Sequence, residues 1–304
     1  MKLVSWFAGL MALVAVVWYF QPEGLPTMVR SLGVTGVAGW ALITVVARLL
    51  QAETTAAPLL AMGYPIRRSD AFWIGWVRTF ANQILPTAGV AAYAQAIRQK
   101  TKISWSEMAV LAAPQYILVA TALGIVGLLA TLTNARALHA SFVALFLIYA
   151  GVILVSVSIT RGAPWLIGLL PETLTGRVQQ ASSALRKFVA YPGLISKVVG
   201  CHGIAILLRG SRLWLLFAAA GLNLDWREIL LVIAVAESSM LIQLTPGGLG
   251  IREGAILGGA ALIGSPAQIA AGVALIDRLL VVAITVLLTP PAIVALKSGE
   301  PTGD

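Results

Sequence analysis

The sequence predicts an all-α membrane protein, a polytopic helix bundle of about six full spans and two shorter, broken-helix hairpins. Two observations lead to this class. Hydrophobic residues make up 59% of the 304 residues and charged residues only 11%, and clusters of proline and glycine interrupt two of the apolar stretches. A soluble domain carries about 25% charged residues, so a surface this apolar has to face lipid. We expect a single integral membrane domain over residues 1–304.

Six apolar stretches are long enough to cross a bilayer, which takes about 20 residues of helix. They cover residues 3–20, 34–60, 108–132, 137–158, 198–222 and 268–296. No small-x-small cleavage site follows the first stretch, so we expect a retained span rather than a signal peptide. Residues 161–195 carry Arg177, Arg186 and Lys187, and their middle, residues 174–189, has helical spacing. They are predicted to form an amphipathic connector on the cytoplasmic surface.

Two further apolar stretches contain helix breakers near their centres. Residues 70–100 are interrupted by residues 85–89 (LPTAG), and residues 228–264 by residues 244–250 (LTPGGLG). Proline and clustered glycine end a helix. Non-helical backbone at membrane depth requires surrounding protein or a water-filled cavity. We interpret both stretches as re-entrant hairpins.

The distribution of basic residues predicts the orientation. Arginine and lysine flank the first hairpin on both sides, whereas the flanks of the second carry little net charge. The positive-inside rule then places the first hairpin entrance and both termini in the cytoplasm of a multi-pass cell membrane protein. Entry from opposite faces would make residues 34–160 and 196–296 an inverted repeat, in which transporters place their substrate site. Chance occurrence of proline and glycine in apolar sequence is the alternative.

The formal net charge of +9 comes mainly from basic residues in short loops. This pattern fits membrane topology and anionic lipid headgroups as partners, and we expect no nucleic-acid binding. Cys201 is the only cysteine, so an intrachain disulfide is excluded. With two histidines beside it in the whole sequence, no metal site or cofactor is expected.

Ionisable residues inside the apolar stretches are the strongest functional signal. One charge at the bilayer centre costs about 2.5–3.5 kcal/mol on insertion scales, so each must pair, meet water or meet a ligand. Six arginines stand against four carboxylates, which leaves a cationic surplus in the interior. The set consists of Arg48, Glu53, Arg78, Arg209, Arg212, Glu237, Arg252, Glu253, Asp277 and Arg278.

Arginine is suited to an anionic headgroup because its planar guanidinium grips phosphate or carboxylate with two hydrogen bonds. Arg209 and Arg212 are three residues apart and share one helix face, and Arg78 lies in the first hairpin. Structural ion pairs are the alternative for each of them. Glu237 is predicted either to couple to protons or to form a static bridge to an arginine.

The glycine turn after Pro246 is predicted to expose backbone amides where the next half-helix begins, which attracts an anion unless Glu253 caps that helix. The predicted substrate-binding residues are Arg78, Asn82, Arg209, Arg212, Glu237, Gln243, Pro246, Gly247, Gly248, Gly250, Arg252, Glu253 and Asp277. No catalytic residue is predicted.

Residues 246–253 (PGGLGIRE) resemble the Pro-Gly-Gly-x-Gly-x-x-Glu signature of the transmembrane region of lysylphosphatidylglycerol synthases and of their stand-alone, flippase-like relatives. Asn82, Pro86 and Gly89 resemble the family's N-terminal signature of Asn-x-x-x-Pro followed by glycine. The acidic residue that usually stands beside that glycine is missing, because Val90 follows here. The resemblance implies movement of lipids between leaflets. We expect no lysyl transfer, because the chain ends soon after the last span.

The leading prediction is therefore a flippase-like transporter of an anionic lipid or a lipid-linked intermediate, and not an enzyme. Two alternatives remain at this point. A membrane-embedded enzyme acting on lipid headgroups would need a nucleophile–base pair or a metal site. A non-catalytic subunit or scaffold of a cell-envelope lipid or glycan pathway would have little use for buried charges.

Overall fold

The computed structural model describes residues 25–85, 87–134, 140–161, 191, 193–239 and 245–298. All regular elements within these residues are helices, which confirms the all-α class. The predicted first span (residues 3–20), most of the predicted connector (161–195), Pro86 and Gln243 lie outside the described residues.

Five long helices correspond to the other five predicted spans. They are α2 (Leu25–Ala61), α5 (Trp105–Thr133), α6 (Ala140–Arg161), α9 (Leu194–Ala219) and α12 (Ala267–Ser298). By length and composition, α2, α9, α12 and the Pro114–Thr133 part of α5 could each cross a membrane. In α6 the apolar part is the shorter segment Val143–Val155. The chain is thus a membrane protein with several helices apolar enough to span a bilayer.

The second span begins earlier than predicted. Helix α2 starts at Leu25, and Gly33, with φ 58° and ψ −178°, kinks it one residue before the predicted start at Val34. Glycine adopts this left-handed backbone without steric cost. The hydropathy pattern therefore located the straight part of α2 but not the helical segment before the kink.

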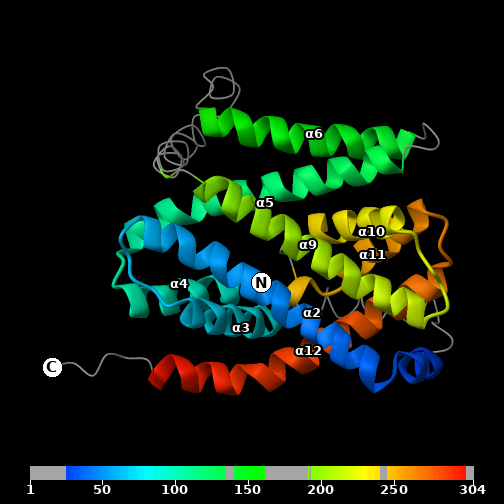
Figure 1. Ribbon diagram of the computed structural model, residues 1–304, viewed down its shortest axis with the longest axis horizontal. Helices are drawn as coiled ribbons and strands as arrows, with labels where there is room; N and C mark the ends of the chain where they lie inside the picture. Colours follow the sequence, from blue (N-terminus) through cyan, green and yellow to red (C-terminus); the bar gives the residue numbers. More distant parts are fainter. Residues whose placement is uncertain are drawn as a thin grey trace.

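Both predicted interruptions occur where the sequence placed them. The first separates α3 (Arg68–Ile84) from α4 (Ala88–Thr101), and the second separates α10 (Trp226–Ser238) from the short 3-10 helix η2 (Pro246–Gly248) and α11 (Ile251–Leu262). Within each pair the two half-helices pack side by side (Figure 1). Each pair is a helical hairpin inside the bundle.

Gly259 shows why α10 and α11 approach so closely. A Cβ atom at Gly259 would lie 2.9 Å from the Cα atom of Val232. Small residues allow such close packing of helices in membranes. Around this contact, Leu231, Val232 and Ile233 of α10 are completely buried. Helix α10 therefore runs through the core, and it carries Glu237 near its C-terminal end.

The tips of the two hairpins meet near the middle of α12. The guanidinium of Arg278 donates to the carbonyl oxygen of Gly247 at 2.6 Å and to the Oε1 atom of Gln83 at 2.8 Å. A Cβ atom at Gly247 would come within 2.4 Å of that same Oε1 atom. One α12 residue thus holds the end of α3 against the turn of the second hairpin.

The packing of the long helices is reciprocal. Helices α2 and α9 pack along one another, α12 packs against α3 of the first hairpin, and α5 packs against α10 of the second (Figure 1). In each half, a long helix (α2 or α9) is followed by a hairpin and then by a second long helix (α5 or α12). That second helix packs against the hairpin of the other half. This order agrees with a repeat of residues 34–160 and 196–296, which stays a prediction, as do the membrane faces from which the hairpins enter.

Candidate functional site

A cavity of about 810 Å³ lies where the two hairpins meet α2, α9 and α12. Ligand pockets for small molecules usually measure about 300–1,000 Å³. Nine of the predicted substrate-binding residues line it: Arg78, Asn82, Arg209, Arg212, Glu237, Gly247, Arg252, Glu253 and Asp277. Pro246, Gly248 and Gly250 belong to the adjacent turn and are not part of the lining. Gln243 lies outside the described residues.

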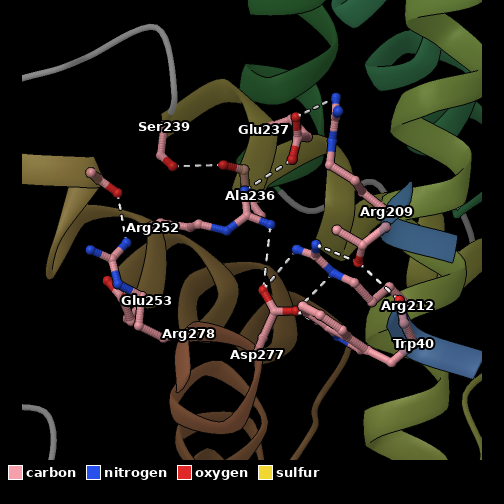
Figure 2. A network of polar contacts seen from close by, with 12 residues as sticks. Trp40, Arg209, Arg212, Ala236, Glu237, Ser239, Arg252, Glu253, Asp277 and Arg278 are labelled. Atoms are coloured by element: carbon pink, nitrogen blue, oxygen red, sulfur yellow. Dashed lines mark hydrogen bonds and ion pairs between the residues drawn. The ribbon is translucent and has the colours of Figure 1, made fainter. Parts of the chain in front are cut away.

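Glu237 bridges two arginines from different helices. Its Oε2 atom lies 2.8 Å from Nη2 of Arg209 on α9, and its Oε1 atom accepts a hydrogen bond from Nη1 of Arg252 on α11 at 2.9 Å (Figure 2). The side chain of Glu237 is 9% exposed. Of the two alternatives predicted for Glu237, this geometry corresponds to the static bridge to an arginine. A role in proton coupling stays a prediction.

Asp277 is an almost completely buried carboxylate of the network. Its Oδ2 atom accepts a hydrogen bond from Nη2 of Arg212 at 3.0 Å, and its Oδ1 atom lies 2.8 Å from Nε of the same guanidinium. Oδ1 also accepts a hydrogen bond from the indole N–H of Trp40 at 3.1 Å (Figure 2). The Trp40 ring also stacks under the guanidinium, 4.7 Å from ring centroid to Arg212 Cζ. Asp277 and Arg212 are 1% and 4% exposed. This contact is a buried, bidentate ion pair between α9 and α12.

Glu253 caps the second half-helix of its hairpin, as one of the predicted alternatives has it. Its Oε2 atom accepts a hydrogen bond from the backbone N–H of Gly250 at 2.7 Å. The amides of Gly248 and Leu249 donate to carbonyls of the same turn. The turn therefore satisfies these three amides internally and does not present them to an anion.

Asn82 performs the corresponding task in the first hairpin. Its Oδ1 atom accepts a hydrogen bond at 2.8 Å from the backbone N–H of Gly89, in the first turn of α4. A Cβ atom at Gly89 would lie 2.3 Å from the carbonyl oxygen of Arg78. The spacing of asparagine and glycine thus closes the hairpin, while the Asn82 side chain also lines the cavity.

Arg48 and Arg78 differ from the other cavity arginines. Arg48 donates to Thr79 Oγ1 at 2.8 Å and lies 4.9 Å from the Trp76 ring, and Arg78 lies 5.1 Å from the Tyr93 ring. Within the described residues, neither has a carboxylate within ion-pair distance. Arg48 was grouped with the buried charges but not with the predicted site, because sequence alone does not show which arginines lack partners.

Glu53, the fourth carboxylate of the predicted set, lies outside the cavity lining. It pairs with Arg68 at 2.6 Å and with Lys197 at 2.5 Å, and both cations are substantially exposed. Among the described residues, six arginines and three carboxylates line the cavity, so its positive surplus is larger than the sequence count indicated.

The family model of the lysylphosphatidylglycerol synthase transmembrane region matches residues 6–289. The chain belongs to this family. The positions that resemble the signatures of the lysylphosphatidylglycerol synthase transmembrane family, Asn82, Gly89, Gly247 and Glu253 among them, gather at the two hairpin tips.

A curated relative is a UPF0104 membrane protein of Methanothermobacter thermautotrophicus, 25% identical over 115 residues. The match covers 36% of this chain and 34% of the relative, so the chain spans about a third of the length of that protein. No solved structure matches the chain.

Proposed function

We propose that this protein moves an anionic lipid, or an anionic lipid-linked intermediate, between the leaflets of the cytoplasmic membrane without changing it chemically. The observation that carries the proposal is the charge of the cavity, to which the part of the chain that the structure describes contributes six arginines and three carboxylates. Membership in a membrane family is consistent with a lipid-related role.

The surplus charge calls for an anion. Arg48 and Arg78 lie among membrane-spanning elements, where an unneutralised guanidinium is expensive and marks a functional site by default. A bound anion would lower that cost through charge-assisted hydrogen bonds, which are about twice as strong as neutral ones. A lipid phosphate supplies the anion, and acyl chains suit the apolar surroundings of the helices.

The hairpins provide a means of movement. Both contribute to the cavity lining, and their tips meet at Arg278. In transporters, broken helices at the midplane commonly surround the substrate while one repeat rocks against the other. We propose that the two hairpins separate and close in turn, so that the cavity opens to one leaflet at a time, with both chain termini in the cytoplasm.

Reconstitution tests the proposal. Liposomes with fluorescent phosphatidylglycerol in both leaflets are mixed with dithionite, which quenches only the outer leaflet. We expect the purified protein to make nearly all of the fluorophore quenchable. Arg78→Gln should slow the movement, whereas Arg67→Gln, an exposed loop residue, should leave it unchanged.

Movement no faster than in protein-free liposomes, over a range of protein-to-lipid ratios, would contradict transport. Conversion of the lipid into a new chemical species would support a headgroup enzyme instead.

A further inference from the structure

Resting on the proposed function, we infer that the lipid phosphate binds to Arg48 and Arg78, on the wall formed by α2 and α3. We further infer that this site selects phospholipids whose headgroup carries no positive charge. Arg209 and Arg212, the sequence-based choice for the headgroup, each pair with a carboxylate of the second half instead.

The first step is the partition of charge between the two halves of the chain. All three carboxylates of the lining, Glu237, Glu253 and Asp277, come from the second half, from α10, α11 and α12. The second half also supplies four of the six arginines. The first half contributes Arg48 and Arg78 and no carboxylate to the described lining. An anion entering the cavity is therefore drawn most strongly to the wall of the first half.

The second step concerns free hydrogen-bond donors. The Nε and Nη2 atoms of Arg212 contact the carboxylate of Asp277, and Nη2 of Arg209 contacts that of Glu237. Arg48 donates one hydrogen bond, to Thr79, and Arg78 donates none within the described residues. A guanidinium has five N–H donors. Arg48 and Arg78 thus keep the donors that bidentate phosphate recognition requires.

The third step is preorganisation. The Arg48 side chain lies against α3, where a Cβ atom at Gly75 would come 3.0 Å from its Cδ atom, and the Trp76 ring supports its guanidinium. Tyr93 supports Arg78 in the same way and donates to Thr55 of α2 at 3.3 Å. Stacking on aromatic rings fixes the planes of both guanidinium groups without neutralising them. A site ordered before binding loses less entropy when the ligand arrives.

The fourth step sets the headgroup class. The polar neighbours on this side of the lining are uncharged and include Thr44, Gln51 and Gln115. His202 also lines the cavity, and its buried Nε2 atom has no hydrogen-bond partner. Amides, hydroxyls and a spare imidazole nitrogen suit hydroxyl groups. An ammonium headgroup would be repelled by the surplus arginines, so choline and ethanolamine lipids should bind more weakly than glycerol lipids.

Direct binding tests the site. Native mass spectrometry of the detergent-purified protein gives the occupancy of added dioleoylphosphatidylglycerol and of dioleoylphosphatidylcholine. We expect phosphatidylglycerol to bind about 10-fold more tightly, and Arg48→Gln or Arg78→Gln to weaken it by about 10-fold or more, since each removes a hydrogen bond between charged groups. Arg78→Lys should lose less, because it keeps the charge but not the fork.

The controls separate binding from folding. Arg67→Gln makes the same charge change on an exposed loop and should bind as the wild type does. Arg209→Gln should have a smaller effect than Arg78→Gln. Wild-type affinity in both Arg48→Gln and Arg78→Gln, or equal affinity for the two lipids, would overturn the inference. Displacement of the lipid by an equal concentration of inorganic phosphate would do so too, because the ligand would then be a soluble phosphate.

The leaflet-exchange assay distinguishes this inference from the proposed function. If the wild type moves phosphatidylglycerol and both variants move it equally fast, the assignment of Arg48 and Arg78 is wrong and transport stands. If the wild type moves no lipid but the binding pattern holds, the phosphate site stands and transport fails.

Discussion

Replacing Asp277 by alanine should destabilise the protein more than replacing any other single residue of the ion pairs described above. In Asp277→Ala, Arg212 would lose both of its short contacts, at 2.8 and 3.0 Å, and Trp40 would lose its acceptor. Asp277 and Arg212 are almost completely buried. Leaving one member of a buried pair without its partner costs about 3–5 kcal/mol. We expect the free energy of unfolding to fall by that amount.

The measurement is an unfolding titration with sodium dodecyl sulfate in mixed micelles, followed by tryptophan fluorescence. Glu53→Ala is the matched control, because Glu53 also forms ion pairs but with two cations that are substantially exposed. It should cost no more than about 1 kcal/mol, the range of surface ion pairs. The double variant Asp277→Leu with Arg212→Met should recover most of the loss, because it removes both charges and keeps apolar volume.

Two results would refute this reasoning. One is a loss in Asp277→Ala as small as that in Glu53→Ala, which would mean that water reaches the Arg212 guanidinium. The other is a double variant as unstable as the sum of its single variants, which would mean that the two residues are not energetically coupled.

The remaining predictions concern the hairpins and the start of α5. Gly89→Ala should lower the free energy of unfolding by about 1–3 kcal/mol in the same titration, because the added Cβ atom would lie 2.3 Å from a backbone carbonyl oxygen. Gly200→Ala is the control and should stabilise the protein slightly, because its Cβ atom would meet nothing within 4 Å. Equal effects of the two substitutions would contradict the close approach at Gly89. Arg278→Met should free the hairpin tips, seen as faster hydrogen exchange in residues 246–250, and unchanged exchange would show that other contacts hold them. Hydrogen bonds from the Ser104 side chain, and then from Tyr64, lower the pKa of Glu107 from 4.5 to about 2. The capping box of Ser104 and Glu107 should therefore stabilise the start of α5 fully above pH 4.5 and less as the pH falls toward 2. Ser104→Ala should move this loss of stability to higher pH. Hydrogen exchange of the first amides of α5, corrected for intrinsic rates, measures both effects.

Much of the fold followed from the sequence because the bilayer limits the choices. Backbone groups in hydrocarbon must be satisfied within a helix, so apolar length alone predicted α2, α5, α6, α9 and α12. Proline and glycine act locally on the backbone, and residues 85–89 and 244–250 therefore located both interruptions. The start of α2 was missed because Gly33 kinks that helix without ending it.

The roles of single site residues were less predictable. Asn82 and Glu253 are seven and three residues from the amides they cap, and the capping role of Glu253 was readable from its position. For Asn82, no local rule connects a side chain on one half-helix with the first turn of the next. Arg212 and Arg48 look alike in sequence, since both are arginines within apolar helices.

By itself, the sequence determined that the chain is a membrane helix bundle, where its helices break, and that its interior holds more positive than negative charge. Only the tertiary structure decided which charges neutralise one another. Pairing depends on which helices pack together: α12 brings Asp277 to Arg212 across 65 residues, while Glu53 turns to Arg68 and Lys197 outside the cavity. Coulomb energy falls with distance in space and not along the chain, so composition fixes the total charge and packing fixes where the surplus remains.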